Sequence, residues 1–211
     1  MSSSLRSNAN EPLTHSDRAE AILTFWFGAS KPKTVGQYRK EWFVKSNDFD
    51  QQIRQHFLVD IEKAAQGDYD HWQQQARYAV ALLILLDQFP RNIYRGSAKS
   101  FETDHKAIEV ATKLVETEMD QTLPPVYQFF IYVPFEHQET LAQQNRAVAL
   151  MTQLVKRHPN IDQGLKSGLD FAIRHRDVIE RFGRFPHRNE ILGRQSTAEE
   201  KAFLTQPGSR F

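Results

Sequence analysis

Cysteine is absent from the 211-residue chain, which excludes disulfides, thiolate zinc sites, iron–sulfur clusters and a cysteine nucleophile. No apolar run approaches the roughly 20 residues that a membrane-spanning helix needs, and the first residues lack the apolar stretch of a secretory signal. An excess of one charge is also missing, because 27 Lys and Arg face 26 Asp and Glu, for a net charge of +1. We therefore expect a cytoplasmic protein with neither a nucleic acid nor a membrane as partner.

The chain also lacks the short motifs that indicate a cofactor. It has no Gly-Lys-Ser/Thr phosphate loop, no Gly-x-Ser-x-Gly elbow and no dinucleotide-binding glycine pattern. A His-x-x-x-His pair is missing too, so neither a metal nor a cofactor is predicted. Four separate side chains could still assemble a metal site in space: Glu136, His137, His175 and His187. Whether the protein is an enzyme stays open at this point.

Helical periodicity, in contrast, runs through nearly the whole chain. Phe49, Ile53, Phe57 and Ile61 recur every four residues and form one apolar stripe, which Gly67 ends. Similar stripes predict further helices: Ala19, Ile22, Leu23 and Trp26; Trp72, Ala76, Ala79, Val80, Leu83 and Leu86; Phe101, Ile108, Ala111, Leu114 and Val115; Leu141, Val148, Met151 and Val155; Leu165, Leu169, Ala172, Ile179 and Phe182. Such a succession predicts an all-α fold of stacked antiparallel helical hairpins.

Capping residues and prolines mark the predicted helix ends. Ser16 is expected to cap the first helix and Gly28 to end it, whereas Thr197 and Glu200 have the spacing of a capping box before a last short helix. Phe89-Pro90 is expected to end the long central helix, because the residue before a proline avoids the α conformation.

Two further features concern the order of the chain. Residues 126–133 are its most strand-like stretch, but the prolines on both sides favour a short buried helix. The Ser- and Asn-rich residues 1–13 cannot bury enough apolar surface to become ordered, so we expect a disordered tail there. Residues 14–205 are predicted to form a single domain, and residues 206–211 a short C-terminal tail.

Charged residues gather where the helical pattern breaks. Asp87 follows five apolar residues at a predicted helix C-terminus, where burial and the helix dipole both disfavour a carboxylate. We therefore expect a cationic partner, with Arg91 and Arg95 nearby. Glu136 and His137 follow the apolar stretch 126–133, and a histidine there could exchange a proton near neutral pH. The alternative is architectural: an Asp–Arg clasp at one corner and an acidic helix N-terminus at the other.

The densest of these segments spans residues 175–194. His175 lies on the apolar stripe of its predicted helix, so it faces inward, either as a satisfied core residue or toward a cavity. The following loop holds Arg184, His187 and Arg188, with two phenylalanines anchoring it and a glycine and a proline fixing the backbone. Arginine's planar guanidinium suits a phosphate or a carboxylate, so this loop is a candidate anion-binding element.

Two of the charged segments resemble each other. Residues 89–97 read FPRNIYRGS, and residues 185–196 read FPHRNEILGRQS. Each has Phe-Pro, then Arg-Asn, an isoleucine, a glycine and a serine that can cap a following helix. The match is short and needs small gaps, so chance could produce it. If it is real, it predicts two similar corners that face each other across one groove.

These motifs also give the chain a family resemblance. LLDQFPRNIYRGSAKSFETD, YVPFEHQE and HRDVIERFGRFPHRNEILGRQSTAEE together resemble the uncharacterised family numbered 924 among the domains of unknown function. The resemblance extends from Ile22 to Leu204 and implies an all-α, tetratricopeptide-like superhelix. It implies no activity, substrate or catalytic residue.

Two functions are compatible with this sequence. In the first, nine side chains converge on one polar pocket that binds a small phosphate- or carboxylate-bearing ligand: Asp87, Arg91, Arg95, Glu136, His137, His175, Arg184, His187 and Arg188. An enzymatic version would use His137 or His187 as acid or base. In the second, the helical stack is a protein- or peptide-interaction module without catalysis, which predicts an open groove with exposed aromatic side chains.

Overall fold

A computed structural model describes residues 14–28 and 39–209, except for the side chain of His15. Every regular element in these two ranges is helical, so the all-α prediction is confirmed, and residues 126–133 belong to a helix. The α-helices are α1 (His15–Phe27), α2 (Asn47–Gln66), α3 (Ala76–Leu83), α4 (Phe89–Ile93), α5 (Asp104–Glu116), α6 (Pro125–Glu136), α7 (Leu141–Arg157), α8 (Gln163–Phe182) and α9 (Ala198–Leu204). Short helical turns connect them: η1 (Lys40–Trp42), η2 (Asp70–Gln74), η3 (Ile84–Gln88), η4 (Ala98–Phe101), η5 (Met119–Thr122) and η6 (Pro186–Arg188).

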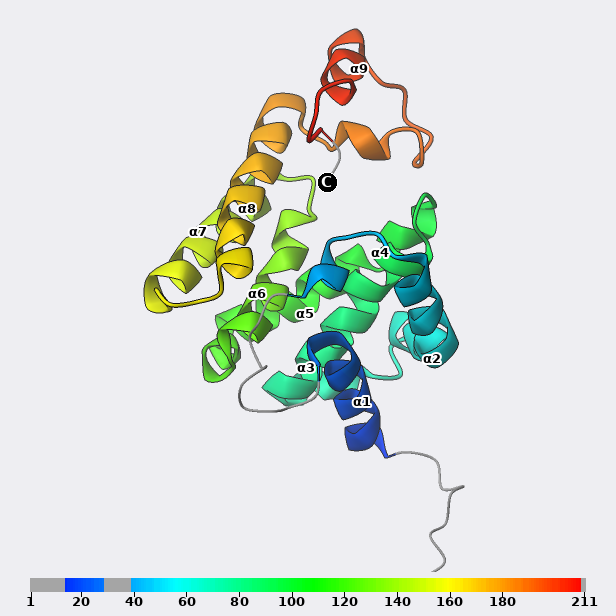
Figure 1. The fold of residues 1–211 in the computed structure, drawn as a ribbon, viewed down its shortest axis with the longest axis vertical. Helices are drawn as coiled ribbons and strands as arrows, with labels where there is room; N and C mark the ends of the chain where they lie inside the picture. Colours follow the sequence, from blue (N-terminus) through cyan, green and yellow to red (C-terminus); the bar gives the residue numbers. More distant parts are fainter. Residues whose placement is uncertain (1–13, 29–38, 210–211) are drawn as a thin grey trace, which may run out of the picture.

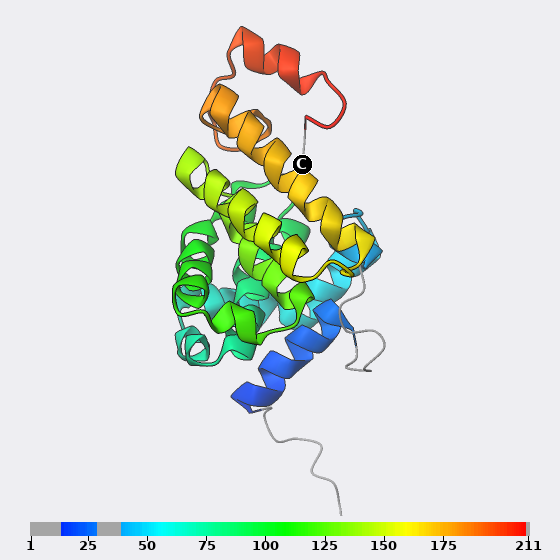
Figure 2. The same cartoon turned by 90° about the vertical axis from the view of Figure 1, so that its left-hand side faces the viewer.

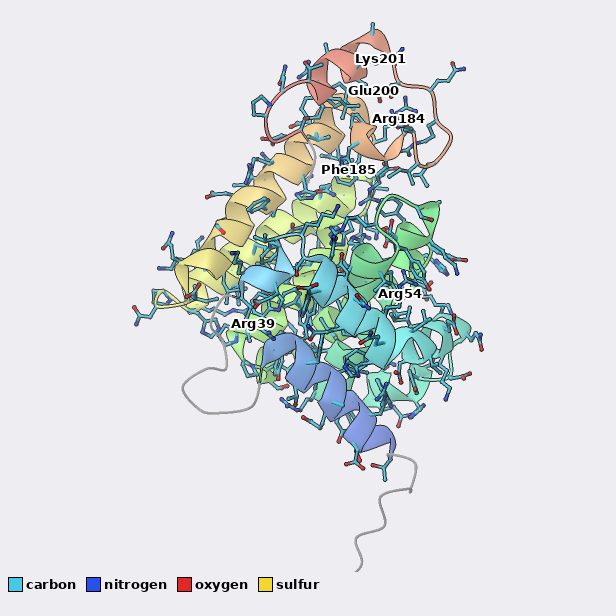
Figure 3. The ribbon with its side chains drawn as sticks, turned by 45° about the vertical axis from the view of Figure 1, so that its right-hand side comes forward. Arg39, Arg54, Arg184, Phe185, Glu200 and Lys201 are labelled. Carbon is cyan, nitrogen blue, oxygen red and sulfur yellow. The ribbon has the colours of Figure 1, made fainter. Side chains whose placement is uncertain are left out.

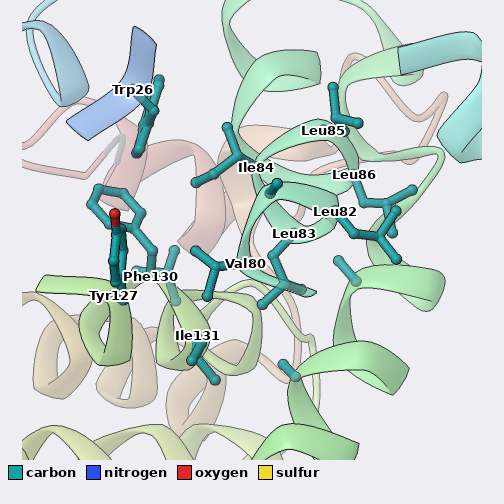
Figure 4. Packing of buried hydrophobic residues seen from close by; sticks show 14 of the residues in the cluster. Trp26, Val80, Leu82, Leu83, Ile84, Leu85, Leu86, Tyr127, Phe130 and Ile131 are labelled. Atoms are coloured by element: carbon teal, nitrogen blue, oxygen red, sulfur yellow. The ribbon is translucent and has the colours of Figure 1, made fainter. Parts of the chain in front are cut away.

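The most apolar helices lie at the centre. All residues from 126 to 136 of α6 are buried, and so is the run from Ala79 to Leu86 along α3 and η3. Figure 4 shows Val80 and Ile84 facing Phe130 and Ile131 of α6, with Trp26 of α1 beside them. The Trp26 and Phe130 rings meet edge to face with centroids 5.5 Å apart. Burial of this apolar surface is the main source of stability for such a fold.

The second half of the molecule is a layered run of long helices. Helix α6 packs on α7 and α7 on α8, and both views show α7 and α8 lying alongside each other (Figures 1 and 2). Gly168 allows α8 to approach α6 closely, because a Cβ there would lie only 2.2 Å from Phe129 Cε2. The tetratricopeptide-like character of this stacking stays a prediction.

The C-terminal part builds a small core of its own. Val178 and Ile179 of α8 surround Phe185 together with Phe182 and Phe203. Helix α9 therefore lies against the end of α8, at one extremity of the molecule (Figure 1). Ser209, in the predicted C-terminal tail, is buried and donates its hydroxyl to the Leu204 carbonyl at 3.2 Å. The predicted tail 1–13 lies outside the described residues.

The helix ends agree with the sequence in most places. Gly28 and Gly67 end α1 and α2, and the capping box of Thr197 and Glu200 is present at α9. At α1 the predicted cap Ser16 is wrong, because Thr14 caps the helix through a capping box with Asp17. Both residue types cap well, and the reciprocal bond to Asp17 favours the earlier one.

Two predictions about the central helices are corrected. Phe101 does not open a helix; it ends the short turn η4, and α5 begins at Asp104. Phe89-Pro90 does not end the helical path either, since α4 continues to Ile93. The chain passes Pro90 because η3 is a π-helical turn, in which the Phe89 N–H bonds the Ile84 carbonyl five residues back.

Candidate functional site

The π-helical turn η3 positions Asp87, the first residue of the site. Pro90 has no N–H to offer to the Leu86 carbonyl four residues before it. That carbonyl accepts the Thr103 hydroxyl instead, and the Asp87 carbonyl accepts the Arg91 guanidinium at 2.8 Å. The backbone groups freed by the proline are therefore bound by side chains, and the widened turn holds the Asp87 carboxylate inside the protein, 1% exposed.

Three side chains bind this buried carboxylate. Its Oδ1 lies 2.9 Å from Arg91 Nη1 and 2.7 Å from His137 Nδ1, and Gln88 Nε2 donates to its Oδ2 at 2.5 Å. Asp87 thus joins the end of η3 to the turn after α6. The predicted cationic partner is Arg91, four residues along the same helical path.

The two corners that resemble each other in sequence meet at Asp104. Arg91 Nη2 lies 2.9 Å from Asp104 Oδ2, and Arg188 Nη1 lies 3.6 Å from the same oxygen. Both guanidinium groups also lie over the ring of Phe101, at 5.8 and 4.5 Å from its centroid. The equivalent arginines of the motifs FPRN and FPHRN are therefore the two cations that share one carboxylate.

Glu136 and His175 form a further contact next to these residues. His175 Nδ1 contacts the Phe171 carbonyl at 2.8 Å and lies 3.9 Å from Glu136 Oε2. Both side chains are at least nine-tenths buried. We call the seven residues assembled here the central polar cluster: Asp87, Arg91, Asp104, Glu136, His137, His175 and Arg188.

Burial and neighbouring charges set the protonation of the cluster. Burial alone would raise the pKa of Asp87, but Arg91 and His137 outweigh it and hold this pKa at about 2. Burial, reinforced by Asp87, raises the pKa of Glu136 well above its usual value. Burial and Arg91 lower the pKa of His137. At neutral pH the cluster therefore holds an ionised Asp87 and a neutral His137, and its environment favours the protonated form of Glu136.

The remaining two groups follow the same rule. Burial lowers the pKa of His175 to about 3, which keeps its imidazole neutral. Burial and the nearby Arg91 lower the pKa of Arg188 to about 10. Arg188 stays charged at neutral pH, but its environment compensates the charge less well than water does.

Six of the nine predicted site residues belong to the central polar cluster: Asp87, Arg91, Glu136, His137, His175 and Arg188. His187 lies next to the cluster: its ring packs near Phe185 with centroids 5.5 Å apart, and it contributes to lowering the pKa of His175. Arg95 and Arg184 lie elsewhere and do not join it. Arg95 faces Asp50 of α2 at 3.3 Å.

Arg184 belongs to a second group of ion pairs. Its guanidinium binds Glu200 at 2.7 and 2.9 Å and the Gln195 carbonyl at 2.9 Å. Figure 3 shows Arg184 and Glu200 together in the C-terminal part, with Phe185 toward the body of the molecule. Nearby, Arg194 binds both oxygens of Glu139 at 2.6 and 2.9 Å. We call these four residues, Glu139, Arg184, Arg194 and Glu200, the C-terminal clasp.

Sequence reasoning missed Asp104, Phe101 and Thr103. All three lie in the segment SFETD, which closes the first family motif. An available signal was the first turn of α5, because Asp104 stands where the helix dipole favours a carboxylate. Only the fold shows that this turn lies against Arg91 and Arg188.

Three polar atoms of the cluster are buried without a hydrogen bond to any described residue: Glu136 Oε1, Asp104 Oδ1 and Arg188 Nε. Buried polar atoms are paired in the great majority of cases, by protein, water or ligand. Three such atoms in one cluster leave hydrogen-bonding capacity for a further polar group. Arg91, Asp104 and His137 keep exposed side-chain fractions of 20, 14 and 14%, so solvent reaches the edge of the cluster.

Other sites of interest lie outside this cluster. One pocket has a volume of about 320 Å³ and is lined by Ile61, Glu62, Ala65, Gln66, Pro90, Tyr94, Lys99, Glu102 and Thr103. None of the nine predicted residues lines it. In the described ranges, no group of three or more His, Asp or Glu side chains is arranged to hold a metal ion. None of the helices described is long and apolar enough to cross a membrane.

The fold and the site together define a helical protein with a buried, partly unsatisfied ionic cluster between two similar corners. Residues 22–208 match the family of bacterial proteins of unknown function called DUF924, and the chain belongs to this family. A solved structure of a protein of unknown function from Agrobacterium tumefaciens is 37% identical, covers 90% of this chain and 98% of its own, and has a TM-score of 0.78. No curated protein matches the chain.

Proposed function

We propose that the central polar cluster binds a small anion that carries a phosphate or a carboxylate group. The observation that supports this most is the state of Arg188. Its guanidinium is buried, with the residue only 6% exposed, yet its Nη1 contacts Asp104 only at 3.6 Å. Its Nε has no hydrogen bond to any residue that the structure describes.

The surroundings of Arg188 strengthen its attraction for an anion. The ring centroids of Phe101 and Phe185 lie 4.5 and 4.7 Å from the Arg188 guanidinium carbon. The two rings exclude water from the guanidinium. The nearest carboxylate, Asp104, is already bound by Arg91 at 2.9 Å. An oxyanion could accept from the N–H groups of Arg188, and charge-assisted hydrogen bonds of this kind are about twice as strong as neutral ones.

The size of the ligand follows from the exposure of the cluster. The Arg188 side chain is 8% exposed, and the most exposed side chain of the central polar cluster, that of Arg91, is 20% exposed. A large polymer could not reach a side chain this buried without rearranging the cluster. The alternative function, a protein- or peptide-interaction module, stays a prediction.

Thermal unfolding in the presence of simple anions tests the proposal. Inorganic phosphate and malonate are added at constant ionic strength, with chloride as the reference. At a tenfold excess over Kd, a ligand that binds only the folded state contributes about 1.4 kcal/mol, which raises Tm by about 3–5 °C for a chain of this size. We expect this rise with phosphate or malonate and not with chloride.

A matched pair of variants locates the site. Arg188→Gln should lose the anion-dependent rise in Tm, whereas Arg184→Gln, which removes an arginine of the C-terminal clasp, should keep it. The proposal fails if Arg188→Gln retains the full rise, or if the two variants lose it equally.

A further inference from the structure

The hydrogen bond between Asp87 and His137 fixes which nitrogen of the imidazole faces a ligand. Asp87 is buried and accepts from Arg91 and Gln88 through its two oxygens, so its carboxylate is ionised and cannot donate a proton. The 2.7 Å contact with His137 Nδ1 therefore requires Nδ1 to carry the hydrogen. In a neutral imidazole the other nitrogen, Nε2, then has a free lone pair and can only accept.

This lone pair is available. No hydrogen bond or ion pair joins His137 Nε2 to another of the described residues, and the side chain is 14% exposed. Titratable and charged groups of four elements interact with the imidazole: Asp87 of η3, Arg91 of α4, Asp104 of α5 and His175 of α8. The central polar cluster thus contains donors on Arg188 and an acceptor on His137. Arg91 links the two, because it binds Asp87, the partner of His137, and Asp104, the partner of Arg188.

We infer that His137 selects an anion that still carries a proton, such as hydrogen phosphate or a hydroxy-carboxylate. Such a ligand complements both halves of the site, because its oxyanion accepts from Arg188 and its O–H donates to His137 Nε2. An anion without a hydrogen to donate, such as sulfate at neutral pH, would place an oxygen lone pair against the Nε2 lone pair. This inference rests on the proposed anion site and adds the identity of its specificity residue.

The role of Asp87 is to position His137. Its carboxylate holds the tautomer and the orientation of the ring, as second partners of functional histidines commonly do. The π-helical turn and Pro90 place this carboxylate, and Thr103 binds the carbonyl that the proline leaves free. The features that set η3 apart from an ordinary helix therefore converge on the His137 imidazole.

Phosphate and sulfate are nearly isosteric and distinguish the inference from the proposed function. Apparent dissociation constants are measured for both anions at neutral pH and constant ionic strength. We expect phosphate to bind about tenfold more tightly than sulfate, the ratio that one additional hydrogen bond provides. In His137→Leu phosphate should lose this advantage while sulfate binding stays the same or improves. His105→Leu, at an exposed histidine of α5, should keep the preference.

Each outcome has a separate meaning. Equal binding of the two anions by the unmodified protein overturns the inference but leaves the anion site standing. Binding of neither anion overturns both. A preference for phosphate that survives in His137→Leu assigns the selection to another residue and overturns the inference.

A second measurement needs no variant and covers the case in which His137→Leu does not fold. Nitrogen NMR of the intact protein labelled in its histidines reports the tautomer of each imidazole. We expect His137 to carry its hydrogen on Nδ1 at neutral pH. A hydrogen on Nε2 would overturn the inference, because that nitrogen could then not accept from a ligand.

Discussion

The central polar cluster and the C-terminal clasp both pair arginines with carboxylates, but they differ in how completely these groups are hydrogen-bonded. In the clasp, arginine nitrogens bind both oxygens of each carboxylate: Arg184 binds Glu200 and Arg194 binds Glu139. Arg194 leaves its Nε unbonded, but its two terminal nitrogens both reach Glu139. In the central polar cluster, Asp104 and Glu136 each leave one oxygen without a partner among the described residues.

The comparison separates an architectural ion-pair group from a candidate site. The Glu139 carboxylate accepts the Phe185 backbone N–H at 2.7 Å, and the ring of Phe185 lies against Arg188 and His175. Glu139 and Arg194, which both bind the Phe185 backbone, therefore fix the loop that delivers Arg188. In the central polar cluster the positive charge of Arg188 is only partly compensated. A bound anion would complete this compensation.

The largest expected effect comes from breaking the central polar cluster. Asp87→Asn removes the charge between Arg91 and His137 at a carboxylate that is 1% exposed. Removing one partner of a buried ion pair costs about 3–5 kcal/mol when the other charge loses its compensation. Arg91 keeps its contact with Asp104 at 2.9 Å, so the loss should lie at the lower end of this range. We expect the free energy of unfolding, measured by urea denaturation, to fall by this amount.

The matched change in the clasp should cost much less. Glu139→Gln removes a carboxylate that is 26% exposed and leaves Arg194 at 25% exposure with access to water. A pair of this exposure contributes about 1 kcal/mol or less. Equal losses for Asp87→Asn and Glu139→Gln would contradict the distinction between the two groups.

The sequence was sufficient for the all-α fold class and for six of the seven residues of the central polar cluster. Apolar spacing of about 3.6 residues predicts where helices lie, and it did so along α2, α7 and α8, since burial of one stripe determines each of them. Asp87 and Arg91 were predictable as partners because a carboxylate after five apolar residues needs a cation. The two residues are four positions apart on one helical path, so their side chains are neighbours in sequence as well as in space.

What the sequence could not predict is non-local. Pro90 looked like a helix end, because the rule for the preceding residue assumes α-helical hydrogen bonds, whereas a π-helical turn supplied another solution. Asp104 has no local sign of interaction with Arg188, which lies more than 80 residues away. In the sequence, Arg184 and Arg188 are equally plausible anion ligands of the same loop. In the fold, the capping box of α9 fixes Glu200, and Arg184 binds it.

The pH dependence of stability is a further difference expected between the central polar cluster and the C-terminal clasp. Burial lowers the pKa of His175 to about 3 in the folded protein, whereas an unfolded histidine titrates near 6.5. The stabilisation from the neutral imidazole is therefore fully present above about pH 6.5 and is lost as the pH falls toward 3. Relative to His175→Phe, the unfolding free energy of the unmodified protein should fall by roughly 1.4 kcal/mol per pH unit across this window.

A packing variant at the same ring is the control for this titration. Phe185→Leu loses contact with the His175 ring, whose centroid lies 5.5 Å from that of Phe185. It should lower the free energy of unfolding by nearly the same amount at every pH. A difference between His175→Phe and the unmodified protein that does not vary between pH 4 and 6.5 would mean that His175 is charged in the fold.

A smaller effect than that of Asp87→Asn is expected at the hydroxyl that supports the π-helical turn. Thr103→Val keeps the shape of the side chain and removes the donor to the Leu86 carbonyl, which Pro90 cannot satisfy. A buried carbonyl left without a partner costs about 1–2 kcal/mol. Thr117→Val removes an exposed hydroxyl that donates to the Lys113 carbonyl, and water can replace it. Urea denaturation should therefore show a loss for Thr103→Val and nearly none for Thr117→Val. If the turn is what aims Asp87 at His137, Thr103→Val should also weaken phosphate binding; a fall in stability with unchanged phosphate affinity would make the turn merely architectural, like the clasp.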